Sequence, residues 1–162
     1  RGFSGNSGIP TENNLYLDGI STIEWILENT KFNSEDIINY GESLGSGVAV
    51  ELNLKYKFLC TVLEAPFTSI ADVANKRYKI YPTKLLVKDK FDNLSKIDRI
   101  KSPILIISGT KDEVIPHIHS KLLFDKANSP KKSLFIDEAM HNNLYEFGIE
   151  KTVINFTLKL WK

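Results

Sequence analysis

The sequence predicts an α/β fold with a doubly wound, mostly parallel sheet. Short apolar runs typical of buried strands alternate along the chain with longer segments whose apolar residues have helical spacing. The run Pro103–Ser108 is apolar up to its final serine, as expected of a strand that is buried on both faces. With 162 residues, the chain has enough material for one domain with a substantial core.

In the first half of the chain, two strands and three helices are expected. A helical stripe of apolar residues runs through Leu15–Glu28 and would cover one face of the sheet. A strand at Ile37–Tyr40 leads into a helix of small residues at about Leu44–Leu54. The apolar run Phe58–Glu64 predicts the next strand, and Ile70–Lys76 begins a further helix.

The second half of the chain continues the alternation. After the strand Pro103–Ser108, Pro116 is expected to begin a helix over Pro116–Ala127, because proline is favoured in a first helical turn. Ser133–Ile136 predicts a short strand, and Ile149–Leu160 predicts a closing amphipathic helix. Four strands are therefore expected.

The segment Gly41-Glu42-Ser43-Leu44-Gly45 has the pattern G-x-S-x-G between a predicted strand and a predicted helix. In that context the serine lies on a tight, strained turn with its hydroxyl pointing up and out of the sheet. We expect both Gly41 and Gly45 to be required, because a Cβ at either position would collide with the neighbouring strand or helix. Ser43 is therefore the candidate nucleophile.

A serine hydroxyl needs a base near pH 7, and the base needs an orienting carboxylate. Asp112 follows the strand Pro103–Ser108, and His141 lies on the loop after Ser133–Ile136. Both positions are C-terminal strand ends, the edge at which open α/β sheets bind ligands. The chain order serine, aspartate, histidine also suits this motif.

Other side chains compete for these roles. Glu113 is adjacent to Asp112, and Asp137 is close to His141 in sequence, but Asp137 directly follows its strand and suits a turn. His117 and His119 form an H-x-H pattern, yet positions two apart on a helix point to different sides. We therefore prefer Asp112 as the acid and expect no metal site.

Several segments together resemble a known family: RGFSGNSGIPTE, GESLGSG, LEAPFTSI, PILIISGTKDEVIP and the His141 loop. They resemble the serine hydrolases of the α/β-hydrolase superfamily, in the branch that holds lysophospholipase-like and depalmitoylase-like hydrolases and the serine aminopeptidase relatives. The resemblance runs from Arg1 to about Leu160. It implies that Ser43 is the nucleophile, Asp112 the acid and His141 the base, and that no cofactor or metal is needed.

By the same resemblance, residues 1–162 are the C-terminal two-thirds of a hydrolase domain whose N-terminal strands are absent from this chain. The strand Ile37–Tyr40, central in the complete fold, would then be a sheet edge. The backbone N–H of Leu44 would be one oxyanion donor, and the second would come from a loop that this chain lacks. A lid or cap is expected at residues 75–91, with an ordinary surface connection as the alternative.

Composition excludes several classes of protein. The formal net charge is +1, and no basic stripe indicates nucleic-acid binding. The one cysteine, Cys60, excludes an intramolecular disulfide and lies in an apolar strand. No apolar run approaches the roughly 18 residues of a membrane span. We expect a cytoplasmic or membrane-associated protein, with any membrane association made through the absent N-terminus.

The predicted function is that of a serine hydrolase that cleaves an ester, thioester or amide bond through an acyl-enzyme. The substrate would be a small-molecule or lipid-like acyl compound, and esterase or lipase-like activity is favoured over peptidase activity. Two alternatives stay open: a non-catalytic domain that acts in binding or interaction, and an acyltransferase that uses the same acyl-enzyme.

Overall fold

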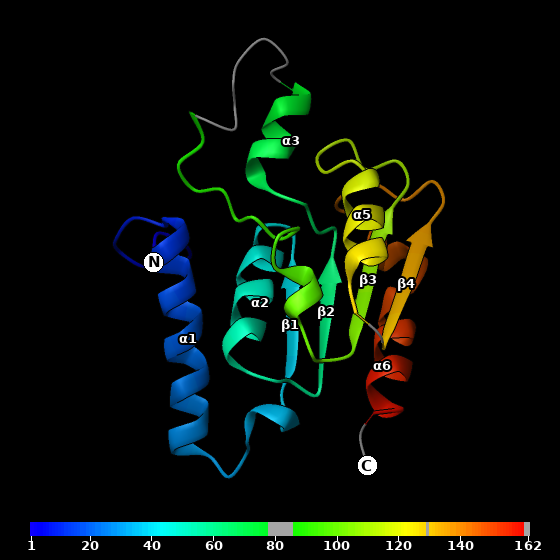
Figure 1. The fold of residues 1–162 in the computed structure, drawn as a ribbon. Helices are drawn as coiled ribbons and strands as arrows, with labels where there is room; N and C mark the ends of the chain where they lie inside the picture. The colour runs from blue at the N-terminus through cyan, green and yellow to red at the C-terminus, as the bar shows by residue number, and fades with distance from the viewer. Residues whose placement is uncertain (78–85, 129, 161–162) are drawn as a thin grey trace.

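The sheet has four parallel strands in sequence order, β1 (Ile38–Glu42), β2 (Cys60–Glu64), β3 (Ile104–Gly109) and β4 (Lys131–Ile136). A computed structural model of the chain describes residues 1–77, 86–128 and 130–160. For residues 76 and 77 it describes the main chain but not the side chains. All four C-terminal strand ends lie at the same edge of the sheet (Figure 1). The prediction of a parallel α/β sheet is confirmed.

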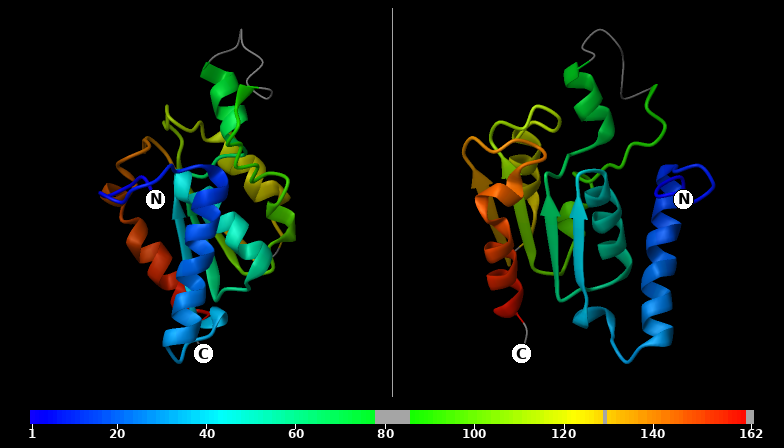
Figure 2. Two further views of the ribbon diagram at one scale, coloured as in Figure 1. Left: turned by 90° about the vertical axis from the view of Figure 1, so that its left-hand side faces the viewer. Right: turned by 180° about the vertical axis from the view of Figure 1, so that it is seen from behind.

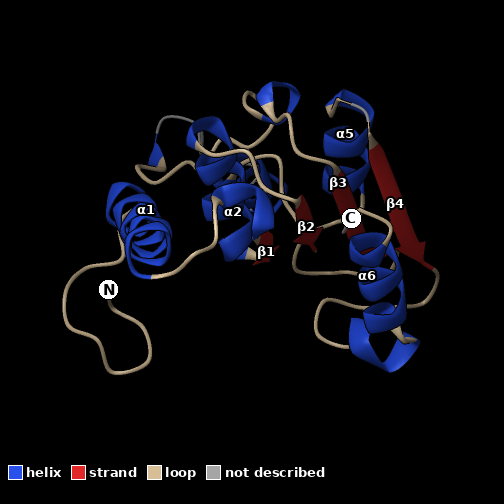
Figure 3. Cartoon of the chain, turned by 90° about the horizontal axis from the view of Figure 1, so that it is seen from below, coloured by secondary structure: helices blue, strands red, loops and turns tan. Residues whose placement is uncertain are grey.

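Helices cover both faces of this sheet. Helices α2 (Leu44–Lys55) and α5 (Ile118–Lys126) lie on one face, with α1 (Glu12–Asn29) beside α2, and α6 (Ile149–Leu158) lies on the other face (Figures 2 and 3). Helix α3 (Ile70–Arg77) stands beyond the C-terminal ends of the strands (Figure 1). Three short 3-10 turns, η1, η2 and η3, occupy Ser34–Asp36, Ile97–Arg99 and Leu144–Phe147.

The predicted elements are present, and their ends differ from the expected ones for local reasons. Helix α1 begins at Glu12 rather than Leu15, because the Thr11 side chain caps it by accepting a hydrogen bond from the Asn14 N–H. The expected start of α5 at Pro116 is wrong. The helix begins at Ile118, and Pro116 lies in the turn before it, where the Pro116 carbonyl accepts a hydrogen bond from the His119 N–H at 2.9 Å.

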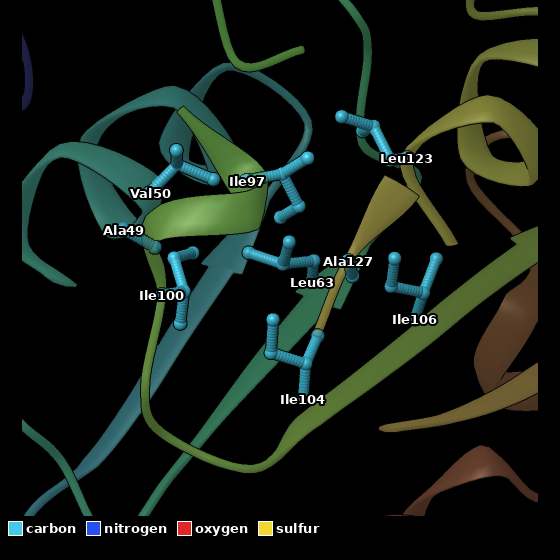
Figure 4. Close-up of a cluster of buried hydrophobic side chains, with 9 residues drawn as sticks. All are labelled: Ala49, Val50, Leu63, Ile97, Ile100, Ile104, Ile106, Leu123 and Ala127. Atoms are coloured by element: carbon cyan, nitrogen blue, oxygen red, sulfur yellow. The ribbon is translucent and has the colours of Figure 1, made fainter. Parts of the chain in front are cut away.

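Two apolar clusters hold the layers together. The cluster between the sheet and α2, η2 and α5 is drawn in Figure 4, and its members are Ala49, Val50, Leu63, Ile97, Ile100, Ile104, Ile106, Leu123 and Ala127. The cluster on the α6 face contains Val62, Ala65, Leu105, Ile107, Ala139, Leu144 and Ile149. Because alternate residues of β3 enter opposite clusters, this strand is buried on both faces, as its apolar sequence predicts.

Strand β1 forms one edge of the sheet, as expected. Its face toward α2 is buried at Asn39 and Gly41. On the opposite face, Ile38 is 41% and Tyr40 39% exposed. The strand that carries the G-x-S-x-G turn is therefore supported by β2 on one side and by α2 on one face.

The segment expected to form a lid, residues 75–91, lies partly outside the described residues. Tyr78, Tyr81, Pro82 and Leu85 belong to the part that is not described. At the end of the segment, Phe91 is buried and packs edge to face against Tyr16 and Phe67. The lid stays a prediction.

Two further expectations concern burial. Cys60 is buried, and burial raises the pKa of its thiol to about 11, which makes it a small apolar core residue. Across the described ranges, no helix is both long enough and apolar enough to cross a bilayer.

The central position of β3 gives a stability prediction. Leu105 is completely buried in the α6-face cluster, whereas Leu158 at the end of α6 is 64% exposed. Leu105→Ala should lower the free energy of unfolding by about 2–5 kcal/mol, because it removes apolar burial and leaves a cavity. Leu158→Ala, the same chemical change at the surface, should stay within about 0.5 kcal/mol. Denaturant titration of the natural full-length protein measures both, and equal losses would contradict this account of the core.

Candidate active site

Ser43 lies in the turn between β1 and α2 in a strained conformation. Its backbone φ is 49° and its ψ is −118°, a combination that residues other than glycine rarely adopt. Two main-chain hydrogen bonds hold it there. The Ser43 N–H donates to the Glu64 carbonyl at 2.9 Å, and the Ser43 carbonyl accepts from the Ser46 N–H at 3.0 Å.

The two glycines of the motif are not equivalent. A Cβ on Gly41 would lie 2.6 Å from the Gly45 carbonyl oxygen and 2.7 Å from the Ala49 Cβ, so β1 and α2 can approach only with glycine there. A Cβ on Gly45 would meet no atom within 4 Å. The expectation that both glycines prevent a collision is therefore right for Gly41 and wrong for Gly45, which is partly exposed on the first turn of α2.

Asp112 is held rigidly on the loop after β3. Its Oδ1 accepts hydrogen bonds from the N–H groups of Val114 at 2.9 Å and Ile115 at 2.8 Å. The residue is buried, and its other oxygen, Oδ2, faces His141. A carboxylate fixed in this way by backbone donors has little freedom to turn away from the imidazole.

His141 connects the aspartate to the serine. Its Nδ1 lies 2.7 Å from Asp112 Oδ2, and its Nε2 lies 3.1 Å from Ser43 Oγ. With the ring proton on Nδ1, the imidazole donates to Asp112, and Nε2 is left as the acceptor for the serine hydroxyl. The structure thus brings together the three residues that the sequence singled out. The carboxylate that contacts Nδ1 of His141 belongs to Asp112, rather than to its competitors for the role of the acid, Glu113 and Asp137.

The loops that carry Asp112 and His141 are joined by main-chain contacts. The Lys111 N–H donates to the Ala139 carbonyl at 3.0 Å, and the Thr110 N–H donates to the Ile136 carbonyl at 3.0 Å. A Cβ at Gly109 would lie 2.1 Å from the Ala139 carbonyl oxygen, so only glycine permits this approach. These contacts fix the aspartate and the histidine relative to each other.

Leu44 is the first residue of α2, directly after Ser43. Because it opens the helix, its N–H has no acceptor one turn earlier in the same helix. The positive end of the helix dipole also lies here, which favours negative charge beside Ser43. The arrangement suits the predicted role of the Leu44 N–H as an oxyanion donor.

The two other histidines face different partners. His117 Nδ1 lies 3.0 Å from Ser108 Oγ, and His119 Nδ1 lies 2.8 Å from Thr68 Oγ1. Burial, assisted by the charge of Lys121, lowers the pKa of His117. In the described part of the chain, no three side chains of the metal-binding types come together.

Glu64 is a residue of this region that the sequence reasoning missed. It is the last residue of β2, only 2% exposed, and it accepts a hydrogen bond from the Tyr40 hydroxyl. Burial raises the pKa of its carboxyl, while the Tyr40 hydrogen bond acts in the opposite direction. The signal in the sequence was an acidic residue that ends an apolar strand at the same edge as Ser43.

A hollow of about 270 Å³ adjoins the histidine. Apolar atoms of Val114 and Met140 contribute to its wall, together with the ring of His141. A larger hollow of about 400 Å³ lies away from these residues, between Asp72, Lys90 and Lys126. Of the three hydrogen-bonded residues Ser43, His141 and Asp112, His141 is the one that lines this smaller hollow.

Comparison with known proteins identifies relatives by sequence. The chain is 37% identical over 149 residues to human alpha/beta hydrolase domain-containing protein 17B, an alignment that covers 91% of this chain and 50% of that protein. The chain thus spans about half the length of the curated relatives it matches, and the matched half is the C-terminal one. No protein-family model matches the chain.

Solved structures show the same fold. An acetyl xylan esterase from Paenibacillus sp. R4 superposes with a TM-score of 0.74 at 18% identity, covering 98% of this chain and 60% of the esterase. A monoacylglycerol lipase from Paleococcus ferrophilus gives a TM-score of 0.66 at 20% identity, covering 96% of this chain and 78% of the lipase. At these identities the likeness establishes the fold alone.

The unequal surroundings of the two motif glycines give a prediction. Gly41→Ala should lower stability by more than about 2 kcal/mol and displace Ser43, because the new methyl group meets main-chain atoms that cannot move aside cheaply. Gly45→Ala, the matched control, should stay within about 1 kcal/mol of the wild type, since the methyl group enters open space. Thermal denaturation of both variants measures the difference, and equal effects would refute it.

Proposed function

We propose that this chain, which belongs to the α/β-hydrolase superfamily, carries the catalytic residues of a serine hydrolase that cleaves an ester, thioester or amide bond. The observation that supports this most directly is the continuous hydrogen-bonded series from Asp112 through His141 to Ser43. A positioned base beside a serine on a strained turn is the arrangement that nucleophilic acyl transfer requires.

In the first step, Ser43 Oγ attacks the carbonyl carbon of the substrate while His141 Nε2 takes the hydroxyl proton. The carbonyl oxygen becomes an oxyanion, and the Leu44 N–H at the start of α2 stabilises it. The tetrahedral species collapses when the bond to the leaving group breaks and His141 returns its proton to that group. The acyl group remains on Ser43 as an ester.

In the second step, water takes the place of the serine hydroxyl. His141 Nε2 removes a proton from the water as its oxygen attacks the acyl carbon, and Ser43 leaves with that proton. Asp112 stays ionised in both steps, keeps the ring proton on Nδ1, and stabilises the imidazolium that forms transiently. No cofactor takes part in this scheme.

For the substrate, we favour a carboxylic ester of a small-molecule or lipid-like acyl compound. The apolar atoms of Val114 and Met140 beside His141 suit a substrate with an apolar portion. The two solved structures described above are named as an esterase and a lipase, which agrees with this preference. A peptide substrate is less favoured.

A covalent probe tests the role of Ser43. A fluorophosphonate should label the natural full-length protein, and Ser43→Ala should abolish the labelling, because the probe reacts with an activated serine. Ser108→Ala is a matched control: Ser108 also contacts a histidine at 3.0 Å, but it is only 1% exposed. This control should keep the label. Labelling that survives Ser43→Ala, or disappears with Ser108→Ala alone, would place the nucleophile elsewhere.

Kinetics test the role of His141. His141→Ala should reduce kcat for a short p-nitrophenyl ester by about 10⁴-fold or more, because the nucleophile loses its base. His117→Ala, which changes a histidine that contacts Ser108 instead, should retain kcat within about threefold. A rate close to that of the wild type in His141→Ala would remove this residue from the mechanism.

A further inference from the structure

We propose that Asn143 is a positioning residue of the active site, whose side chain closes the turn that carries His141. This inference rests on the proposed function, in which His141 is the base that takes the proton of Ser43. It assigns a task to a polar side chain that the acyl-transfer steps do not otherwise use.

The hydrogen bond that Asn143 forms spans His141. The Asn143 Oδ1 accepts a hydrogen bond from the N–H of Met140 at 2.7 Å. Met140 directly precedes His141, and Asn143 comes two residues after it, so the bond closes a loop of main chain around the histidine. Asparagine is suited to this place, because its short side chain can replace a main-chain acceptor in a turn.

His141 lies between two anchored points, in a stretch that belongs to no helix or strand. On one side, Ala139 is completely buried, and its carbonyl accepts a main-chain hydrogen bond at 3.0 Å from the loop of the aspartate. On the other side, Leu144 is buried in the α6-face cluster. Between these anchors the Met140 side chain is 53% exposed and adds little packing. The bond from the Met140 N–H to Asn143 therefore restrains the turn.

Asn143 also connects this turn to η3. It is the N-cap residue of η3, and its carbonyl accepts the Glu146 N–H at 3.0 Å. The main chain of Asn143 is thus fixed by η3, while its side chain reaches back to the residue before His141. Because both bonds belong to one residue, the turn that carries the imidazole is held against a segment whose first residue, Leu144, is buried in the core.

The restraint matters because the imidazole of His141 must meet two partners at once. Its Nδ1 lies 2.7 Å from Asp112 Oδ2, and its Nε2 lies 3.1 Å from Ser43 Oγ. The contact with Asp112 orients the ring, but it does not fix the main chain from which the ring extends. A displacement of about 1 Å at a reacting group can lower a rate on the order of 10²-fold. Asn143 touches neither the substrate nor the transferred proton in this scheme, so it acts through the placement of Nε2.

Kinetics of Asn143→Ala, measured on the natural full-length protein, test the inference. Alanine removes the acceptor, so kcat for a short p-nitrophenyl ester should fall about 10- to 100-fold, while KM stays within about threefold. Asn143→Asp retains an acceptor for the Met140 N–H and should keep kcat within about fivefold of the wild type. A loss of kcat at unchanged KM that aspartate restores separates positioning of the base from binding of the substrate.

Asn33→Ala is the matched control, because Asn33 is also the asparagine N-cap of a 3-10 turn. Its Oδ1 accepts the Glu35 N–H at 2.9 Å in η1, which precedes β1 and lies at the N-terminal ends of the strands, away from Ser43 (Figure 1). Both alanine variants lose a side-chain hydrogen bond of the same kind, so a loss of stability alone would be shared by both. Asn33→Ala should nevertheless retain kcat within about twofold.

Amide hydrogen exchange gives a second test, which needs no turnover. The Met140 N–H should exchange at least about fivefold more slowly in the wild type and in Asn143→Asp than in Asn143→Ala, because the hydrogen bond protects it. Equal exchange in all three proteins would overturn the inference. Should Asn143→Ala fail to fold, the wild type decides: a Met140 amide that exchanges as fast as in an unstructured peptide overturns it as well.

Three kinetic results would also overturn the inference. They are an unchanged kcat in folded Asn143→Ala, an equal loss of kcat in Asn33→Ala, and a kcat that Asn143→Asp does not restore. A failure of the proposed function is distinct from these. It would appear as fluorophosphonate labelling that survives Ser43→Ala while the Met140 amide remains protected.

Discussion

The geometry of the site depends on one main-chain hydrogen bond, from the Ser43 N–H to the Glu64 carbonyl at 2.9 Å. It continues the pairing of β1 with β2 past the last strand residue, so the chain cannot relax out of the turn without breaking the end of the sheet. The left-handed φ of Ser43 costs on the order of 1–3 kcal/mol, which the surrounding packing must offset. The close approach of α2 at Gly41 then fixes the direction of the serine side chain.

The partners of Ser43 reach it from far along the chain. Ser43 and His141 are separated by 98 residues, and Asp112 and His141 by 29. Parallel pairing solves this problem, because it places every C-terminal strand end at one edge. The remaining precision comes from the contact between Gly109 and Ala139, which joins the aspartate loop to the histidine loop. Backbone packing therefore sets the distances between the side chains.

The sequence could predict what local pattern and strand order determine. Strand ends located Asp112 and His141, and the turn motif located Ser43. Gly45 was misjudged because its environment depends on which atoms surround the first turn of α2, and no motif carries that information. The early start expected for α5 had a similar cause, since Pro116 suits both a helix start and the turn before it. Glu64 was overlooked because the burial of a carboxyl at a strand end is a tertiary property.

Contact between a serine and a histidine is not enough to make a nucleophile, and this chain contains its own counterexample. Ser108 lies 3.0 Å from His117, a distance close to the 3.1 Å between Ser43 and His141. Ser108 is buried within β3, however, and burial lowers the pKa of His117, which disfavours the imidazolium that a base must become. At His141, Asp112 instead provides a carboxylate at 2.7 Å. The carboxylate on the imidazole and the access to Ser43, rather than proximity alone, distinguish the candidate site from the structural pair.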